Sequence, residues 1–234
     1  MKSLVIFDLD GTLINSIDDL GHAANHALEH YGYPTHDLSA YHFFAGNGVT
    51  RLIERALPLE DRSQSNIDRL RLKFTEYYEA HLTDFTRPYD GITALLETLA
   101  RMNINVAVAS NKYQAAVDKI IPTLFPDTKF AAVEGHREGV PSKPDPSIVF
   151  NILSQCPTPK DDVLYVGDSG IDMETAFRAG VFSVGVTWGF RPRHELEKNA
   201  CAIISKPVDL LDLLSDRALL ESRFVIRKFI IRNS

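Results

Sequence analysis

The chain has 234 residues, more than the common domain length of about 100–150, so it fits one domain with an insertion or two modest domains and excludes a long multidomain protein. It carries 25 Lys and Arg against 31 Asp and Glu, a formal net charge of −6, and 44% of its residues are hydrophobic. This composition argues against a disordered chain, and the acidic balance argues against nucleic acid as the main partner, which favours a positive field.

Cysteine content and apolar runs indicate the compartment. Cys156 and Cys201 are the two cysteines, too few for a disulfide framework, which favours a reducing environment. The apolar run at residues 4–7 is shorter than a signal-peptide core of about 7–15 residues, and no run approaches the ~18–20 residues of a membrane span. We therefore expect a cytoplasmic protein with no stable membrane association.

The first apolar run, residues 4–7, predicts a buried strand. Between residues 15 and 87 no clear strand pattern follows, and apolar residues recur every three to four positions in segments that begin at Ile17, Val49 and Leu70. This spacing is typical of helices with one buried face. We therefore predict a small helical domain, residues 15–87, inserted after the first strand.

Strands and helices alternate from residue 88 onwards. Apolar runs without polar alternation, which are typical of parallel strands buried on both faces, occur five more times. These predicted strands are residues 104–109, 130–133, 163–166, 181–186 and 202–204. Apolar residues at helical spacing lie between them, for example from Ile92 to Leu99. The fold class is therefore expected to be α/β, with a doubly wound parallel, Rossmann-like sheet formed by residues 1–14 and 88–216 and interrupted by the helical domain.

The tail, residues 217–234, differs from the rest of the chain. Its basic residues are accompanied by one acid, Glu221, and are interleaved with apolar triplets. The basic residues are Arg217, Arg223, Arg227, Lys228 and Arg232. Two interpretations stay open: a terminal element that packs on the core or on a second copy of the chain, as in a homodimer, and a basic segment on a membrane surface.

Two acidic residues, Asp8 and Asp10, directly follow the first predicted strand. Ligands of open parallel sheets bind at the carboxyl ends of strands. Residues two apart in an extended chain point the same way, so both carboxylates can face one pocket, and Gly11 lets the backbone turn immediately afterwards. The alternative is a turn that merely ends the strand, for which Asp and Gly are favoured in any case.

A second acidic pair, Asp168 and Asp172, follows the predicted strand at residues 163–166. One of the two could be a helix N-cap, but that explains only one of four acids at two strand ends. Four carboxylates in a small volume repel one another unless a cation neutralises them, and hard oxygen ligands suit Mg²⁺. We predict a magnesium site that involves this pair together with Asp8 and Asp10.

Groups suited to an anionic oxygen lie between the two acidic pairs. Ser110 ends the strand at residues 104–109, and Asn111 is expected at the start of a helix, where a hydroxyl and free backbone amides would point at the same rim. Lys143 lies among three prolines, which restrict the backbone and would hold the ammonium in place. These groups indicate an anionic substrate.

Together, these segments resemble the four motifs of the haloacid dehalogenase superfamily in order and spacing. They are Asp8-Leu9-Asp10-Gly11-Thr12, Ser110, Lys143 before Pro144-Asp145-Pro146, and residues 167–172. The resemblance covers residues 1–216 and implies that residues 15–87 are the helical cap that closes over the site. Three further segments are similar to phosphoglycolate phosphatases within that superfamily: Ser110-Asn111-Lys112, Gly46-Asn47-Gly48 and residues 185–189.

The resemblance implies a role for each acid. Asp8 would attack phosphorus and form an aspartyl-phosphate, and Asp10 would protonate the leaving alkoxide and then take a proton from water. Mg²⁺ would be held by Asp8, Asp168 and the carbonyl of Asp10, with Asp172 as a ligand or as a support. Thr12 is expected to orient Asp10.

The resemblance also implies the phosphate and substrate contacts. In the core they are Thr12, Ser110, Asn111 and Lys143, of which Ser110 and Lys143 take part in catalysis. In the cap they are Gly46, Asn47 and Arg51, which belong to a substrate-specificity loop.

The expected activity is a magnesium-dependent phosphomonoesterase that acts on a small phosphorylated metabolite similar to phosphoglycolate. Asp10 favours phosphoryl transfer over carbon–halogen cleavage, because a halide leaving group needs no proton. Two alternatives stay open. A sugar-phosphate mutase would share all four motifs, and a non-enzymatic receiver-type module would also carry a phosphoacceptor Asp, although such modules have no helical cap.

Overall fold

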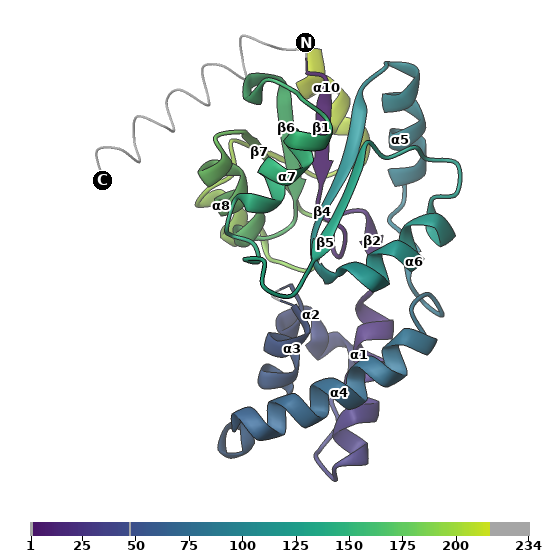
Figure 1. Ribbon diagram of the computed structural model, residues 1–234, viewed down its shortest axis with the longest axis vertical. Coiled ribbons are helices and arrows are strands. Elements are labelled where there is room, and N and C mark those ends of the chain that lie inside the picture. Colours follow the sequence, from purple (N-terminus) through teal and green to yellow (C-terminus); the bar gives the residue numbers. More distant parts are fainter. Residues whose placement is uncertain (1, 47, 216–234) are drawn as a thin grey trace, which may run out of the picture.

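The computed structural model describes residues 2–46 and 48–215 (Figure 1). The expectations for Asn47 and for the tail, residues 217–234, fall outside these described residues. Among the helices of the described part, none is both long and apolar enough to cross a membrane.

A six-stranded parallel sheet forms the core, with the strand order β5-β4-β1-β6-β7-β8. Its strands are β1 (Leu4–Phe7), β4 (Asn105–Tyr113), β5 (Ala132–His136), β6 (Val163–Gly167), β7 (Phe182–Val186) and β8 (Ala202–Ile204). The predicted α/β class and its parallel sheet are confirmed. The predicted bounds were wrong at two places, because β4 continues past residue 109 to Tyr113 and β5 spans Ala132–His136, later in the chain than the predicted 130–133.

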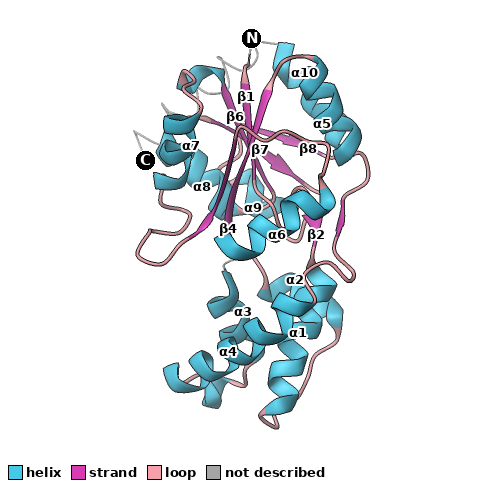
Figure 2. Cartoon of the chain, turned by 45° about the vertical axis from the view of Figure 1, so that its right-hand side comes forward, coloured by secondary structure: helices cyan, strands magenta, loops and turns pink. Residues whose placement is uncertain are grey.

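Helices cover both faces of this sheet (Figure 2). They are α5 (Ile92–Arg101), α6 (Gln114–Leu124), α7 (Ser147–Gln155), α8 (Gly170–Ala179), α9 (Arg193–Glu197) and α10 (Leu210–Ser215). Alternate residues of β1 belong to different hydrophobic clusters: Val5 and Phe7 pack with α5 and α6, whereas Leu4 and Ile6 pack with α7 and α8. Since β1 is buried on both faces, an apolar run without polar alternation was the correct signal for it.

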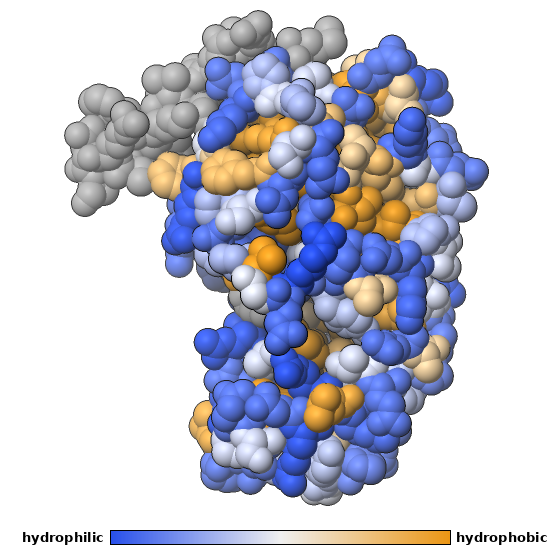
Figure 3. All heavy atoms as spheres, in the orientation of Figure 1, coloured by the Kyte–Doolittle hydropathy of each residue, from blue (hydrophilic) through white to orange (hydrophobic). Residues whose placement is uncertain are grey.

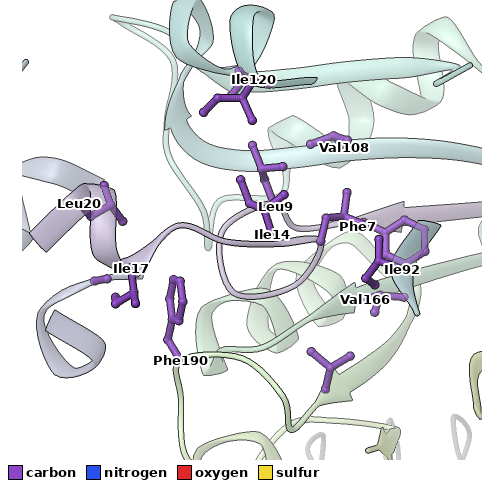
Figure 4. Packing of buried hydrophobic residues seen from close by; sticks show 14 of the residues in the cluster. Phe7, Leu9, Ile14, Ile17, Leu20, Ile92, Val108, Ile120, Val166 and Phe190 are labelled. Atoms are coloured by element: carbon purple, nitrogen blue, oxygen red, sulfur yellow. The ribbon is translucent and has the colours of Figure 1, made fainter. Parts of the chain in front are cut away.

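The first cluster continues past the end of β1. Figure 4 shows Leu9 and Ile14, from the loop that follows β1, beside Phe7 and Val108 of the sheet. All four side chains are at most 1% exposed. The loop that carries the first acidic pair is therefore fixed by its own apolar residues, which face away from solvent.

A group of four α-helices lies apart from the sheet (Figures 1 and 2). These are α1 (Ile17–His30), α2 (Tyr41–Phe44), α3 (Gly48–Ala56) and α4 (Gln64–Ala80), and we call them the helical group. Their shared core contains Ala24 and Leu28 of α1 together with Leu70 and Phe74 of α4, all at most 1% exposed. Residues at helical spacing thus pack as the sequence indicated.

Two short strands join the helical group to the sheet. β2 (Ile14–Asn15) and β3 (Arg87–Pro88) pair antiparallel, so the chain enters and leaves the helical group at one point. Beside this pair, the buried carboxylate of Asp19 accepts hydrogen bonds from the backbone N–H groups of Phe85 and Thr86 and from the Thr86 hydroxyl. This contact ties the returning chain to α1. Each strand has two residues, too few to give a sequence pattern.

Candidate active site

The register of the sheet brings the chemistry-bearing residues to one edge. Phe7 pairs with Val108 on β4 and with Val166 on β6. The residues that follow these three therefore lie side by side near the carboxyl edge of the sheet, where open parallel sheets bind ligands. Asp8 follows β1 and Asp168 follows β6.

Three of the four predicted acids converge. One carboxylate oxygen from each of Asp8, Asp168 and Asp172 lies within 4.8 Å of the other two, and all three residues are buried. We call them the carboxylate cluster. The predicted convergence of the two acidic pairs is therefore present for these three residues.

Lys143 is the cation of the carboxylate cluster. Its Nζ donates to Asp8 Oδ1 at 2.7 Å, to Asp172 Oδ1 at 2.7 Å and to the carbonyl of Ala109 at 2.9 Å. Burial by itself would lower the pKa of Lys143, but the charges of Asp172 and Asp8 outweigh it and hold that pKa well above its usual value. Lys143 is therefore a fixed ammonium at the bottom of the site.

Asn111 positions Lys143 through the backbone. Its Oδ1 accepts from the N–H of Lys143 at 2.9 Å, and its Nδ2 donates to the Lys143 carbonyl at 3.3 Å. The expectation that Asn111 begins a helix was wrong, because β4 runs on to Tyr113 and α6 starts at Gln114. The amide thus clamps the loop that carries the lysine.

Asp172 is held from two sides. Its Oδ2 accepts from the backbone N–H and the hydroxyl of Ser169, at 3.1 and 2.5 Å, while its Oδ1 accepts from the Tyr165 hydroxyl at 3.3 Å as well as from Lys143. Ser169 is the N-cap of α8, and Asp172 completes a capping box with it. Neither acid of this pair is the N-cap. Both oxygens of Asp172 therefore accept hydrogen bonds within the protein, and its role as a metal ligand or as a support stays a prediction.

The electrostatics of the carboxylate cluster fit a divalent cation. Burial, and then the charge of Asp172, raise the pKa of Asp8 to about 7, and the same causes raise that of Asp168 well above its usual value. One ammonium therefore does not compensate three buried carboxylates. A bound cation would remove this repulsion, and carboxylate oxygens are the ligands that Mg²⁺ takes.

Two glycines make room for Asp168. A Cβ on Gly11, whose φ is +89°, would lie 2.4 Å from Asp168 Oδ2, and a Cβ on Gly189 would lie 2.2 Å from the carbonyl of Gly11. Asp168 Oδ2 also accepts from the backbone N–H of Phe190 at 2.7 Å. Both glycines occur in motifs noted from the sequence, but the reason for them is this close approach of two loops.

Asp10 has surroundings of its own. Lys112 Nζ donates to both of its carboxylate oxygens, at 2.9 and 3.0 Å, and the Ser16 hydroxyl donates to Oδ1 at 2.5 Å. The side chain of Asp10 is thus engaged away from the carboxylate cluster, and metal binding by its carbonyl stays a prediction. The buried Thr12 hydroxyl has no hydrogen-bond partner among the described residues, so Ser16 and Lys112 orient Asp10 where Thr12 was expected to.

Sequence reasoning gave no role to Ser16 or Lys112. A signal for Lys112 existed, since Ser110 and Lys112 are two apart in one strand and both are buried, so they point to the same side. The mistaken helix start at Asn111 concealed this alternation. Ser16 lies outside the motifs, and its contact depends on the turn that brings α1 back over Asp10.

A cavity of about 530 Å³ lies between the sheet edge and the helical group. Asp8, Asp10, Ser110, Asn111, Lys112 and Lys143 line it on the sheet side. On the other side it is lined by Gly46 and by Arg71, Thr75 and Tyr78 of α4, among others. Figure 3 shows the surface narrowing where these two parts meet.

Arg51 does not line this cavity. Its side chain is 62% exposed and forms an ion pair with Glu54 on the same helix. Arg71, which the sequence analysis did not single out, is the arginine that lines the cavity from the helical group. Which basic residue faces a cavity depends on how α3 and α4 pack, and helical spacing alone does not give that.

The chain matches the family described as haloacid dehalogenase-like hydrolase over residues 5–186. The chain belongs to this family. The resemblance inferred from the four motifs is thereby confirmed, and so is the expectation of a phosphatase enzyme.

Several relatives of this hydrolase are similar along most of its length. A protein named phosphoglycolate phosphatase from Mesorhizobium japonicum is 32% identical over 206 residues, which are 87% of this chain and 91% of the relative. A solved structure from Lactobacillus delbrueckii subsp. bulgaricus, provisionally described as a phosphoglycolate phosphatase, has a TM-score of 0.86 and 30% identity, and covers 92% of this chain and 99% of its own. A predicted phosphoglycolate phosphatase from Haemophilus somnus has a TM-score of 0.81 and 27% identity, with 91% and 97% covered.

Proposed function

We propose that this hydrolase is a magnesium-dependent phosphomonoesterase that acts on a small phosphorylated metabolite of the phosphoglycolate type. The observation that carries the proposal is the pair of carboxylates with different surroundings on one cavity. Asp8 lies beside Lys143 in the carboxylate cluster, whereas Asp10 is held by Lys112 and Ser16. Two carboxylates in unlike surroundings suit two different roles.

In this mechanism Asp8 attacks phosphorus, so that a bond forms between its oxygen and phosphorus while the bond to the leaving oxygen breaks. Asp10 gives its proton to that leaving oxygen. Water then attacks the aspartyl-phosphate, Asp10 takes the proton from the water, and the bond between Asp8 and phosphorus breaks. Asp8 is regenerated and inorganic phosphate leaves.

The other residues of the cavity stabilise charge on the phosphoryl group. Lys143 contributes its positive charge and the Ser110 hydroxyl a hydrogen-bond donor on the sheet side, and a strong contact of this kind is worth roughly 3–4 kcal/mol in the transition state by analogy with oxyanion holes. Asp8 and Asp168 would hold Mg²⁺ with Asp172 as support, and the carbonyl of Asp10 remains a proposed ligand. When bound, the cation would neutralise phosphoryl charge and help to align the attack.

The division of the chain belongs to the same proposal. Residues 1–14 and 88–216 would form the catalytic core, and residues 15–87, which contain the helical group, would be a cap that sets the leaving group through Gly46 and Asn47. Arg51, which does not line the cavity and pairs with Glu54, would contact substrate only after a movement of the cap. A cytoplasmic location is supported by two free cysteines, Cys156 and Cys201.

Phosphate release from a panel of metabolites tests the proposal, each assay run with Mg²⁺ and with excess chelator. We expect release from small phosphomonoesters, phosphoglycolate among them, with Mg²⁺ and none with chelator. Asp8→Asn should abolish release while the circular dichroism spectrum is unchanged.

Three results would contradict the proposal. Turnover by Asp8→Asn would remove the nucleophile assignment. Stable phosphorylation of the wild type without phosphate release would favour a receiver-type module. Transfer of phosphate to a second sugar would favour a mutase.

A further inference from the structure

Tyr78 of α4 has a buried hydroxyl without a partner. The residue is 1% exposed, and its Oη has no partner in hydrogen-bond geometry among the described residues, although the ammonium of Lys112 lies close to the side chain. Tyr78 also lines the cavity between the sheet and the helical group. Because a buried hydroxyl without a partner is unfavourable, this one calls for a partner that enters the cavity.

The helix presents Tyr78 to the sheet side. Arg71, Thr75 and Tyr78 are spaced by four and three residues, which places them on one face of α4, and all three line the cavity. The ring of Tyr78 lies over the ammonium of Lys112, with 4.9 Å between Nζ and the ring centroid. Tyr78 therefore connects the helical group to the pair formed by Lys112 and Asp10.

The position of Lys112 suits an anionic leaving group. An ammonium has three donors, and Lys112 Nζ gives hydrogen bonds to the two oxygens of Asp10 at 2.9 and 3.0 Å, so its third donor is the one beside Tyr78, with which Lys112 also interacts electrostatically. Lys143 is already committed to Asp8, Asp172 and the Ala109 carbonyl. Lys112 is thus the buried ammonium beside Asp10 that can meet a second negative charge.

We infer that Tyr78 and Lys112 form a subsite for a carboxylate on the leaving group, an inference that rests on the proposed function. Asp10 must reach the ester oxygen, so the remainder of the leaving group lies next to Asp10. In a phosphorylated 2-hydroxy acid the carboxylate is separated from that oxygen by a single carbon, which keeps it within reach of both donors. The Tyr78 hydroxyl gives it a hydrogen bond and Lys112 gives it an opposite charge.

The test compares phosphoglycolate with ethyl phosphate, which has the same two-carbon frame and no carboxylate. The measured quantity is the selectivity, defined as kcat/KM for phosphoglycolate divided by kcat/KM for ethyl phosphate. Tyr78→Phe removes only the hydroxyl, and we expect the selectivity to fall about tenfold, the usual effect of losing a hydrogen bond to a charged group. Tyr77→Phe is the matched control on the same helix, since Tyr77 stacks on His26 and His81 and should keep wild-type selectivity.

A thermal unfolding measurement without substrate separates binding from a structural role. Loss of a hydroxyl that has no partner should leave the unfolding temperature of Tyr78→Phe at or above that of the wild type. A lower unfolding temperature together with unchanged selectivity would overturn the inference, because the hydroxyl would then be satisfied by buried water.

The outcomes also distinguish this inference from the proposed function. No phosphate release from either substrate by the wild type would overturn both. Wild-type turnover without preference for phosphoglycolate, or a preference that Tyr78→Phe leaves unchanged, would overturn the carboxylate subsite alone.

Discussion

Asp8 is buried beside two other carboxylates, which favours its protonated form. Protonation of Asp8 therefore competes with metal binding. Its pKa is raised to about 7, and a cation needs the ionised form. We expect the affinity for Mg²⁺ to rise with pH through about 7. Calorimetric titrations at pH 6, 7 and 8 would check this, and an affinity that is constant across that range would contradict it.

The same raised pKa predicts how stability depends on pH without metal. Since the folded state retains the Asp8 proton where the unfolded state has lost it, this group destabilises the fold as pH rises from about 4 through about 7. Asp8→Asn removes this pH-dependent destabilisation, because asparagine does not ionise. In chelator at pH 8 we expect the variant to unfold at a higher temperature than the wild type, and the difference should shrink towards pH 4.

Ser16 fixes the direction of the Asp10 carboxylate through a 2.5 Å hydrogen bond. Ser16→Ala removes that donor and leaves Lys112 in place, so we expect kcat to fall roughly tenfold, as for the loss of about 1.4 kcal/mol of transition-state stabilisation. Steady-state kinetics would measure this. Ser154→Ala, on an exposed serine that bonds only to a backbone carbonyl, is the control and should retain full activity.

At the scale of the elements, one side chain of α1 holds the residues that lead into β3. Asp19 is 2% exposed, and its carboxylate accepts hydrogen bonds from three donors: the backbone N–H groups of Phe85 and Thr86 and the Thr86 hydroxyl. Asp19→Ala leaves those donors buried and unpaired, and we expect the free energy of unfolding to fall by about 2–4 kcal/mol. Urea unfolding would show it, with the exposed neighbour Asp18→Ala as a variant that stays within about 0.5 kcal/mol of wild type.

The central strands β1 and β6 could be predicted from their apolar runs, because every residue in them is buried and polar residues do not alternate with apolar ones. The same rule missed the end of β4, where Ser110 and Lys112 are polar and yet buried. It also missed β2 and β3, which exist because two distant segments meet. The acids could be located because they follow apolar strands directly, whereas Ser16 and Tyr78 reach the site only through the packing of α1 and α4.

At the scale of the whole molecule, we expect metal binding to increase the free energy of unfolding. A ligand that binds only the folded state stabilises it by about 2.7 kcal/mol at one hundred times its dissociation constant, which is roughly 5–10 °C for a domain of this size. We expect Mg²⁺ to raise the unfolding temperature by this amount. Asp168→Asn should lose most of the shift, and an equal shift in that variant would move the binding site away from the carboxylate cluster.

The pairing of Ile14–Asn15 with Arg87–Pro88 has a consequence for how such an enzyme can change. The ends of the helical insertion meet side by side, so another segment with adjacent ends could replace it while the path of the sheet stays the same. The carboxylate cluster would keep its geometry, since it is built from the sheet edge and its loops. The part of the leaving-group preference that the helical insertion supplies could therefore be exchanged, by recombination or by grafting, while the sheet edge keeps its phosphoryl chemistry.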